Sequence, residues 1–155
     1  MALLSAKDAE TIKRRFESDL VNPVEILLFT QKPSKLVVPG RQECLYCKET
    51  QELLEELVSL NSLLTLKVFD ETDEISHRLY RVGMNEWPVI ILHAPGDTEK
   101  LGVRFYGIPS GYEFGTLLEG LVDISKSTSR LSTASKDLAA RIDKPIHLKV
   151  FVTPT

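Results

Sequence analysis

The sequence predicts an α/β protein in which helices flank a mixed four-stranded sheet. Two segments, VEILLFT at 24–30 and VIILHA at 89–94, are almost continuously apolar, as strands covered on both faces are. Segments with helical spacing separate the predicted strands, so we expect parallel pairing through right-handed crossovers. A short turn at Gly96-Asp97 joins 89–94 to a last strand, which is expected to pair antiparallel with it.

Apolar spacing and capping residues locate the individual elements. Ser5 has the character of a helix N-cap, and Ile12 and Phe16 follow it at helical spacing. Further along, Leu54 shares a helix face with Cys47. In chain order we predict a helix from Ser5 to about Leu20, a strand at 24–30, a loop at 31–43, a helix opened by the cysteines and running to about Leu60, a strand at 64–70, a helix over about 73–82, strands at 89–94 and 101–106, a loop at 107–111 and a helix over 112–126.

Composition excludes several classes of function. Of the 155 residues, 43% are hydrophobic and 26% charged, which is typical of a globular protein. The net charge of −3 and the lack of a basic stripe give no reason to expect nucleic acid as a partner. No apolar run is long enough to cross a bilayer, and the N-terminus has no signal-peptide pattern. We therefore expect no membrane association and a cytoplasmic location, where two cysteines are rarely a static disulfide.

Both cysteines lie in one C-x-x-C motif, at Cys44 and Cys47. The pair follows a buried strand and opens a helix, and in such a β-α-β unit C-x-x-C is typical of thioredoxin-like redox sites. Unpaired N–H groups and the helix dipole favour a thiolate at a helix N-terminus, so Cys44 is the expected nucleophile and Cys47 the resolving thiol. Two alternatives stay open: a pair of ordinary buried thiols, or a metal site completed by a second chain.

The dipeptide Trp87-Pro88 precedes the predicted strand at 89–94. Proline is unusual there because it cannot donate to the sheet. A cis bond would turn backbone amide and carbonyl groups toward the cysteines, where an extended polypeptide substrate could pair with them. The alternative is a trans proline that only begins the strand.

The last part of the chain repeats the pattern of its beginning. A polar linker leads to a predicted helix over about 135–142 and then to a predicted strand at 146–152. NPVEILLFT matches KPIHLKVFV with Pro23 aligned to Pro145 and Phe29 to Phe151. An internal duplication is the favoured explanation, and two unrelated helix–proline–strand units are the alternative.

Several segments together resemble a known family. CLYC after an apolar strand, EWPVIIL further on, GVRFYGIPSGYEF and LKVFVTPT are similar to the N-terminal unit of the glutaredoxin-like protein disulfide oxidoreductases. That family has two tandem thioredoxin-fold units, each with its own C-x-x-C. The resemblance therefore implies a thioredoxin-fold unit over 1–127, followed over 128–155 by a linker, a helix and the first strand of an incomplete second unit.

The resemblance also assigns roles to individual residues. Cys44 matches the attacking cysteine and Cys47 the resolving cysteine, while Pro88, preceded by Trp87, matches the cis-proline beside the site. Leu45-Tyr46 resembles the Pro-Tyr pair of glutaredoxins, with leucine in place of proline. These four residues, Leu45, Tyr46, Trp87 and Pro88, are the expected contacts with substrate.

The expected function is that of a thiol–disulfide oxidoreductase acting on protein disulfides or dithiols without a cofactor or a metal. A thioredoxin-reductase-like donor or a peroxiredoxin-like acceptor would be its redox partner. Two other functions remain open: a non-catalytic interaction module of the same fold, and a metal- or cluster-binding dimer. The predicted strand at 146–152 would leave apolar side chains exposed, so we also expect it to pair with a sheet edge, including that of a second copy.

Overall fold

A four-stranded mixed sheet forms the centre of the protein. The computed structural model describes residues 3–33, 39–40, 42–83, 86–97 and 103–152. The strands are β1 (Val24–Thr30), β2 (Leu64–Asp70), β3 (Val89–His93) and β4 (Arg104–Tyr106), in the order β2-β1-β3-β4. β1 is parallel to β2, β3 is antiparallel to β1, and β4 is antiparallel to β3.

The direction of β3 corrects the expectation that helices between strands impose parallel pairing throughout. Thr30 pairs with Asp70 where β1 and β2 end, and Phe29 pairs with Val89 where β3 begins. The connection that contains the helix after β2 therefore starts and finishes at the same end of the sheet. A connection of this kind reverses the chain, whereas a crossover to the opposite end is needed for parallel pairing.

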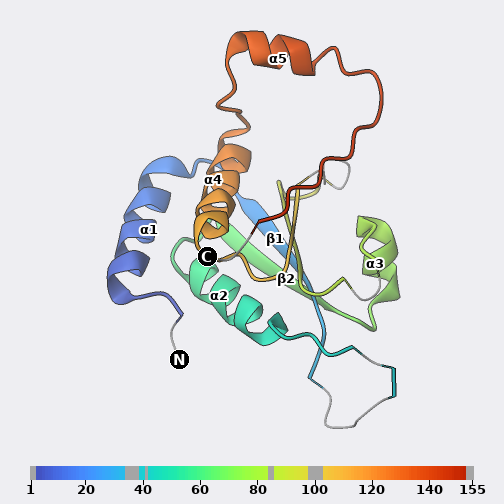
Figure 1. The fold of residues 1–155 in the computed structure, drawn as a ribbon. Helices are drawn as coiled ribbons and strands as arrows, with labels where there is room; N and C mark the ends of the chain where they lie inside the picture. Colours follow the sequence, from blue (N-terminus) through green and yellow to red (C-terminus); the bar gives the residue numbers. More distant parts are fainter. Residues whose placement is uncertain (1–2, 34–38, 41, 84–85, 98–102, 153–155) are drawn as a thin grey trace.

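Helices cover both faces of the sheet (Figure 1). On one face lie α1 (Ala6–Asp19), α2 (Cys47–Ser59) and α4 (Tyr112–Lys126), and on the other lies α3 (Glu74–Tyr80). Ser5 caps α1, because its hydroxyl accepts the N–H of Asp8 at 3.1 Å. The predicted bounds of α4 are confirmed.

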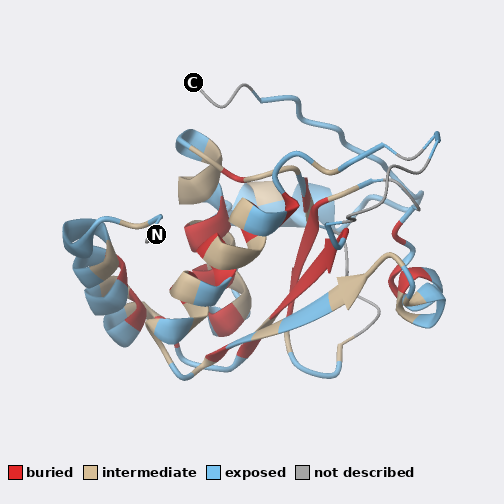
Figure 2. Ribbon diagram, turned by 90° about the horizontal axis from the view of Figure 1, so that it is seen from below, coloured by how far each residue is buried: buried red, intermediate tan, exposed pale blue. Residues whose placement is uncertain are grey.

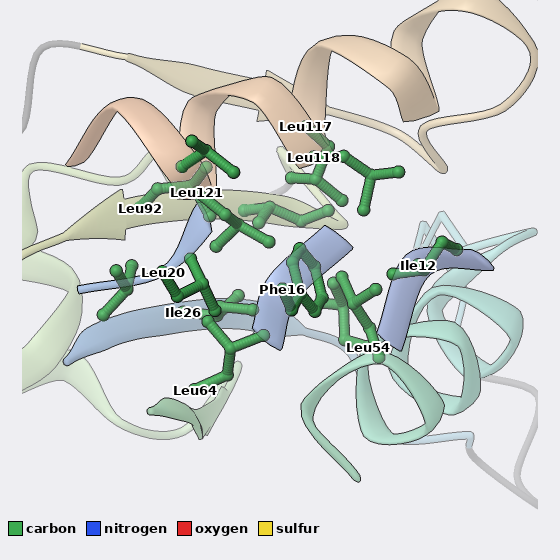
Figure 3. Packing of buried hydrophobic residues seen from close by; sticks show 14 of the residues in the cluster. Ile12, Phe16, Leu20, Ile26, Leu54, Leu64, Leu92, Leu117, Leu118 and Leu121 are labelled. Atoms are coloured by element: carbon green, nitrogen blue, oxygen red, sulfur yellow. The ribbon is translucent and has the colours of Figure 1, made fainter. Parts of the chain in front are cut away.

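Alternating side chains of the strands fill two apolar clusters, one on each face of the sheet. Ile26 and Leu28 of β1 join the larger cluster under α1, α2 and α4, while Leu27 and Phe29 join the smaller cluster under α3. Figure 2 shows that burial concentrates on the strands and on the inner sides of the helices. In Figure 3, Phe16 of α1 lies between Leu54 of α2 and Ile26 of β1 in the larger cluster. This packing holds α2 against the sheet.

Two predicted boundaries differ from the structure. The helix after the linker, α5, spans Thr133–Ala139 rather than 135–142, because the hydroxyl of Ser132 accepts the N–H of Ser135 and caps the helix earlier. β4 begins at Arg104, and part of the strand predicted at 101–106 lies outside the described residues.

The segment 146–152 is not a strand in the structure, contrary to the prediction. Its apolar side chains are exposed, with 83% of Leu148 and 90% of Phe151 accessible. Figure 1 shows α5 standing apart from the sheet and the other helices, and Figure 2 shows the end of the chain as exposed. A strand forms only by pairing, and none of the strands in the described parts of the chain pairs with this segment.

Candidate active site at the start of α2

Cys44 and Cys47 form a disulfide, with their Cα atoms 5.6 Å apart. The two halves differ in exposure. Cys47 is the first residue of α2 and is 4% exposed, whereas Cys44 is only half-buried and precedes the helix. The disulfide is therefore accessible from the Cys44 side.

The start of α2 corrects the expectation that both cysteines lie in the helix. Tyr46 is the N-cap, and its carbonyl accepts both the backbone N–H of Thr50 at 2.9 Å and the Thr50 hydroxyl at 2.7 Å. These two bonds close the first turn of a helix that begins three residues beyond Cys44. No side chain caps α2. The first-turn N–H groups thus carry the positive end of the helix dipole toward the disulfide without a competing side-chain acceptor.

Gln31, directly after β1, contacts both halves of the pair. Its backbone N–H donates to Cys47 Sγ at 3.3 Å. Its side-chain oxygen accepts the N–H of Cys44 at 2.8 Å, and its side-chain nitrogen donates to the carbonyl of Gln42 at 3.2 Å. Gln31 is 7% exposed. Sequence reasoning missed this residue, because one polar residue after an apolar strand carries no signal of its partners.

The two residues between the cysteines project into solvent. Leu45 is 81% exposed and Tyr46 is 53% exposed. The two side chains thus form an exposed apolar surface directly beside the disulfide. Their position agrees with the predicted substrate contacts, which remain a prediction.

The Trp87-Pro88 peptide bond is cis, as expected. Continuing the antiparallel register from Phe29 and Val89 places buried Pro88 opposite Thr30, one residue from Gln31. The dipeptide therefore lies at the end of the sheet that holds the disulfide. The Pro88 carbonyl is used within the protein, because it accepts the N–H of Gly107 at 2.9 Å.

The ring of Trp87 faces the α3 side of the sheet. It packs on the smaller apolar cluster and meets the His77 ring edge-on, with 4.9 Å between centroids. The indole is therefore part of the apolar packing under α3. The Trp87 ring and the Pro88 carbonyl are thus both engaged within the protein.

An ion pair fastens the chain just beyond Gln31. Lys32 binds the carboxylate of Asp70 at the end of β2, and Asp70 also accepts the N–H of Thr72 at 2.8 Å. These hydrogen bonds, led by the one from Lys32, lower the pKa of Asp70 to about 2. The same hydrogen bond raises the pKa of Lys32. The main-chain oxygen of Asp70 accepts from His77 Nε2 at 3.1 Å, so α3 is tied to the same point.

The described parts of the chain contain neither a metal-ligand cluster nor a membrane-spanning helix. Within these parts, no group of three or more His, Cys, Asp or Glu side chains is arranged to hold a metal ion. Of the helices in the described residues, none is long and apolar enough to cross a membrane.

The sheet order, the C-x-x-C disulfide at the start of α2 and the cis-proline before β3 define a thioredoxin-like fold. A protein disulfide oxidoreductase from Aeropyrum pernix shares it, with a TM-score of 0.70 and 24% identity over 89% of this chain and 55% of that one. The alkylhydroperoxide reductase component AhpF of Enterococcus faecalis has a TM-score of 0.68 and 22% identity, over 86% of this chain and 58% of that one.

Curated sequences give a weaker likeness. The F component of alkyl hydroperoxide reductase from Staphylococcus epidermidis is 25% identical over 107 residues, which are 69% of this chain and 18% of the relative. The corresponding protein of Staphylococcus aureus is 24% identical over 108 residues. The chain thus spans less than a fifth of these curated relatives and little more than half of the solved structures. No protein-family model matches it.

Proposed function

We propose that this protein is a thiol–disulfide oxidoreductase that acts on protein disulfides or dithiols through Cys44 and Cys47. The observation that carries the proposal is the asymmetric disulfide at the start of α2. Cys44 is accessible and Cys47 is 4% exposed. The Cys44 sulfur would therefore react with the substrate, and the buried Cys47 sulfur would resolve the resulting mixed disulfide. The thioredoxin-like fold of the protein disulfide oxidoreductase from Aeropyrum pernix supports the same assignment.

In the reducing direction, the Cys44 thiolate attacks one sulfur of the substrate disulfide. A Cys44–substrate disulfide forms, and the first substrate thiolate leaves. The Cys47 thiolate then attacks Cys44 Sγ, which restores the Cys44–Cys47 disulfide and releases the second substrate thiolate. Two electrons pass from the protein dithiol to the substrate, and the two thiol protons pass to the released thiolates through solvent. In the oxidising direction the same steps run in reverse.

Two features of the surface suit an extended polypeptide. Leu45 and Tyr46 give an exposed apolar platform next to Cys44. The Trp87 backbone at the same end of the sheet gives main-chain groups for strand-like pairing. We propose these residues, together with Pro88, as the substrate-contact surface.

Reduction of insulin by dithiothreitol tests the proposed activity. The wild-type protein is expected to shorten the time to insulin precipitation, and Cys44→Ser is expected to abolish the acceleration. Folding of both proteins is checked by far-UV circular dichroism. A folded wild-type protein that gives no acceleration would contradict an oxidoreductase and favour a non-catalytic interaction module.

The roles of the two cysteines are tested by trapping. A Cys47→Ser variant should accumulate a disulfide between Cys44 and a substrate thiol, because the resolving sulfur is gone. Mass spectrometry of the trapped species locates the linkage. Equal trapping at Cys47 in a Cys44→Ser variant would contradict the assignment, since Cys47 is buried.

We further propose a redox donor resembling thioredoxin reductase or an acceptor resembling peroxiredoxin, in a cytoplasmic setting. The likeness to the F component of alkyl hydroperoxide reductase supports a partner of this class. Binding is measured by calorimetry with each candidate in its reduced and oxidised forms. Affinity for neither form of any candidate would contradict this part of the proposal.

The segment 128–155 is proposed as the start of a second thioredoxin-fold unit, with 146–152 able to become its first strand. The internal match of KPIHLKVFV to NPVEILLFT supports this, and so do the exposed Leu148 and Phe151. We propose that the segment pairs with the same segment or a sheet edge of a second copy. Light scattering should then give a dimer mass, and a Val150→Asp variant should shift it to the monomer. A monomeric wild type with fast amide exchange over 146–152 would contradict the pairing.

A further inference from the structure

We propose that Gln31 is a positioning residue for the C-x-x-C pair, and that its side chain sets the reduction potential by fixing Cys44 next to Cys47. The proposal rests on the proposed function and adds to it a residue outside the motif. Gln31 lies thirteen positions before Cys44, and both its backbone and its side chain reach the pair.

The side-chain amide of Gln31 acts like a short piece of strand. The side-chain amide has an acceptor oxygen and an NH2 group with two N–H donors. In Gln31 the oxygen accepts the Cys44 N–H, and the NH2 group donates to the Gln42 carbonyl. These bonds are partly sheltered from water, because Gln31 itself is 7% exposed. The chain before Cys44 is thereby held at two successive points.

We call the two hydrogen bonds of the Gln31 side chain, one with the Cys44 N–H and one with the Gln42 carbonyl, the Gln31 clamp. The contacts that fix Gln31 itself do not depend on the disulfide. Gln31 follows Thr30, which pairs with Asp70 in the sheet, and the neighbouring Lys32 is bound by the Asp70 carboxylate. None of these contacts involves Cys44 or Cys47, so we expect them to remain when the disulfide is reduced. The hydrogen bonds of the Gln31 side chain are therefore expected in the dithiol form as well, where they would hold the Cys44 backbone beside Cys47.

Restricting the dithiol form favours the disulfide. When two reacting groups are held together, their effective concentration rises, and less freedom is lost when the bond forms. Removing the clamp loosens Cys44 more in the dithiol form, where no sulfur–sulfur bond restrains it. The disulfide should then become easier to reduce, and Cys47 should resolve a Cys44 mixed disulfide more slowly.

The test uses Gln31→Met, which keeps the length of the side chain and removes both hydrogen bonds. Equilibration with glutathione buffers should give an equilibrium constant for disulfide formation about tenfold below wild type, which is a potential about 30 mV less negative. Resolution of the Cys44–glutathione disulfide should slow by about fivefold. The control is Gln51→Met in α2, the same chemical change at a side chain bonded to Glu55, and it should match wild type.

An equilibrium constant for Gln31→Met within twofold of wild type would overturn the proposal, and so would an equal change in Gln51→Met. If Gln31→Met does not fold, amide hydrogen exchange in the wild-type protein tests whether the Gln31 side chain holds Cys44. The Cys44 N–H should be protected in both redox forms, and exchange at the rate of an unstructured peptide in the dithiol form would overturn the clamp. The glutathione equilibrium needs no protein substrate, so failure of insulin reduction would refute the proposed function and leave this result interpretable.

Discussion

The Lys32–Asp70 ion pair predicts an acid-sensitive contribution to stability at the end of the sheet that holds the disulfide. The pKa of Asp70 falls from 3.8 to about 2 on folding. A difference of this size corresponds to about 2.5 kcal/mol, at about 1.4 kcal/mol per pKa unit. The Lys32 side chain is 74% exposed, so solvent screening reduces the expected contribution to about 1 kcal/mol.

The direction of the Asp70 pKa change determines how the stability depends on pH. Because the folded protein holds the Asp70 carboxyl at a pKa below its unfolded value, the stabilisation is fully present above about pH 5 and is lost as the pH falls toward 2. Asp70→Asn keeps an acceptor for Thr72 and removes the charge that binds Lys32. At pH 7 it should lower the free energy of unfolding by about 1 kcal/mol, and the difference from wild type should shrink below pH 4.

Urea unfolding from pH 3 to pH 7 measures this difference. In a Lys32→Gln background, Asp70→Asn should cost less at pH 7, because the ion pair is already absent. The reasoning would be refuted by a wild-type to Asp70→Asn difference that stays constant from pH 7 to pH 3. It would also be refuted by the same cost in both backgrounds, since the partner of Asp70 would then not be Lys32.

Two further predictions concern the packing that positions α2 and α4. Leu54→Ala removes a fully buried side chain from the larger cluster and should lower the free energy of unfolding by about 3 kcal/mol, measured by urea unfolding. The Ser125 hydroxyl accepts the N–H groups of residues 21 and 22 at 2.8 and 2.9 Å, so Ser125→Ala should cost about 1–3 kcal/mol. A loss below about 0.5 kcal/mol would contradict the packing argument for Leu54→Ala or the hydrogen-bond argument for Ser125→Ala.

The fold was largely predictable because its signals are local. Continuous apolar runs identified β1 and β3, and helical spacing identified α1 and α4. The direction of β3 was not predictable in the same way. It depends on where the connection after β2 returns to the sheet, and a helical segment in the sequence does not say at which end it finishes.

The segment 146–152 shows the limit of pattern reasoning in another way. Its pattern is that of β1, yet β1 is a strand because β2 and β3 lie on either side of it. The second segment has no such neighbours among the described strands, so the same pattern gives exposed, unpaired chain. A segment with strand propensity forms a strand only where neighbouring strands satisfy its backbone N–H and C=O groups.

The candidate site divides into a predictable and an unpredictable half, and the division has a physical cause. Cys47 is fixed by α2, whose buried Leu53, Leu54 and Leu57 follow a helical pattern that the sequence displays. Cys44 lies outside the helix, and its backbone N–H donates a hydrogen bond to the side-chain oxygen of Gln31, thirteen residues away. Long-range polar contacts of this kind have no periodicity. The sequence therefore pointed to the two cysteines as the candidate site, while the hydrogen bond between Cys44 and Gln31 became visible only in the folded chain.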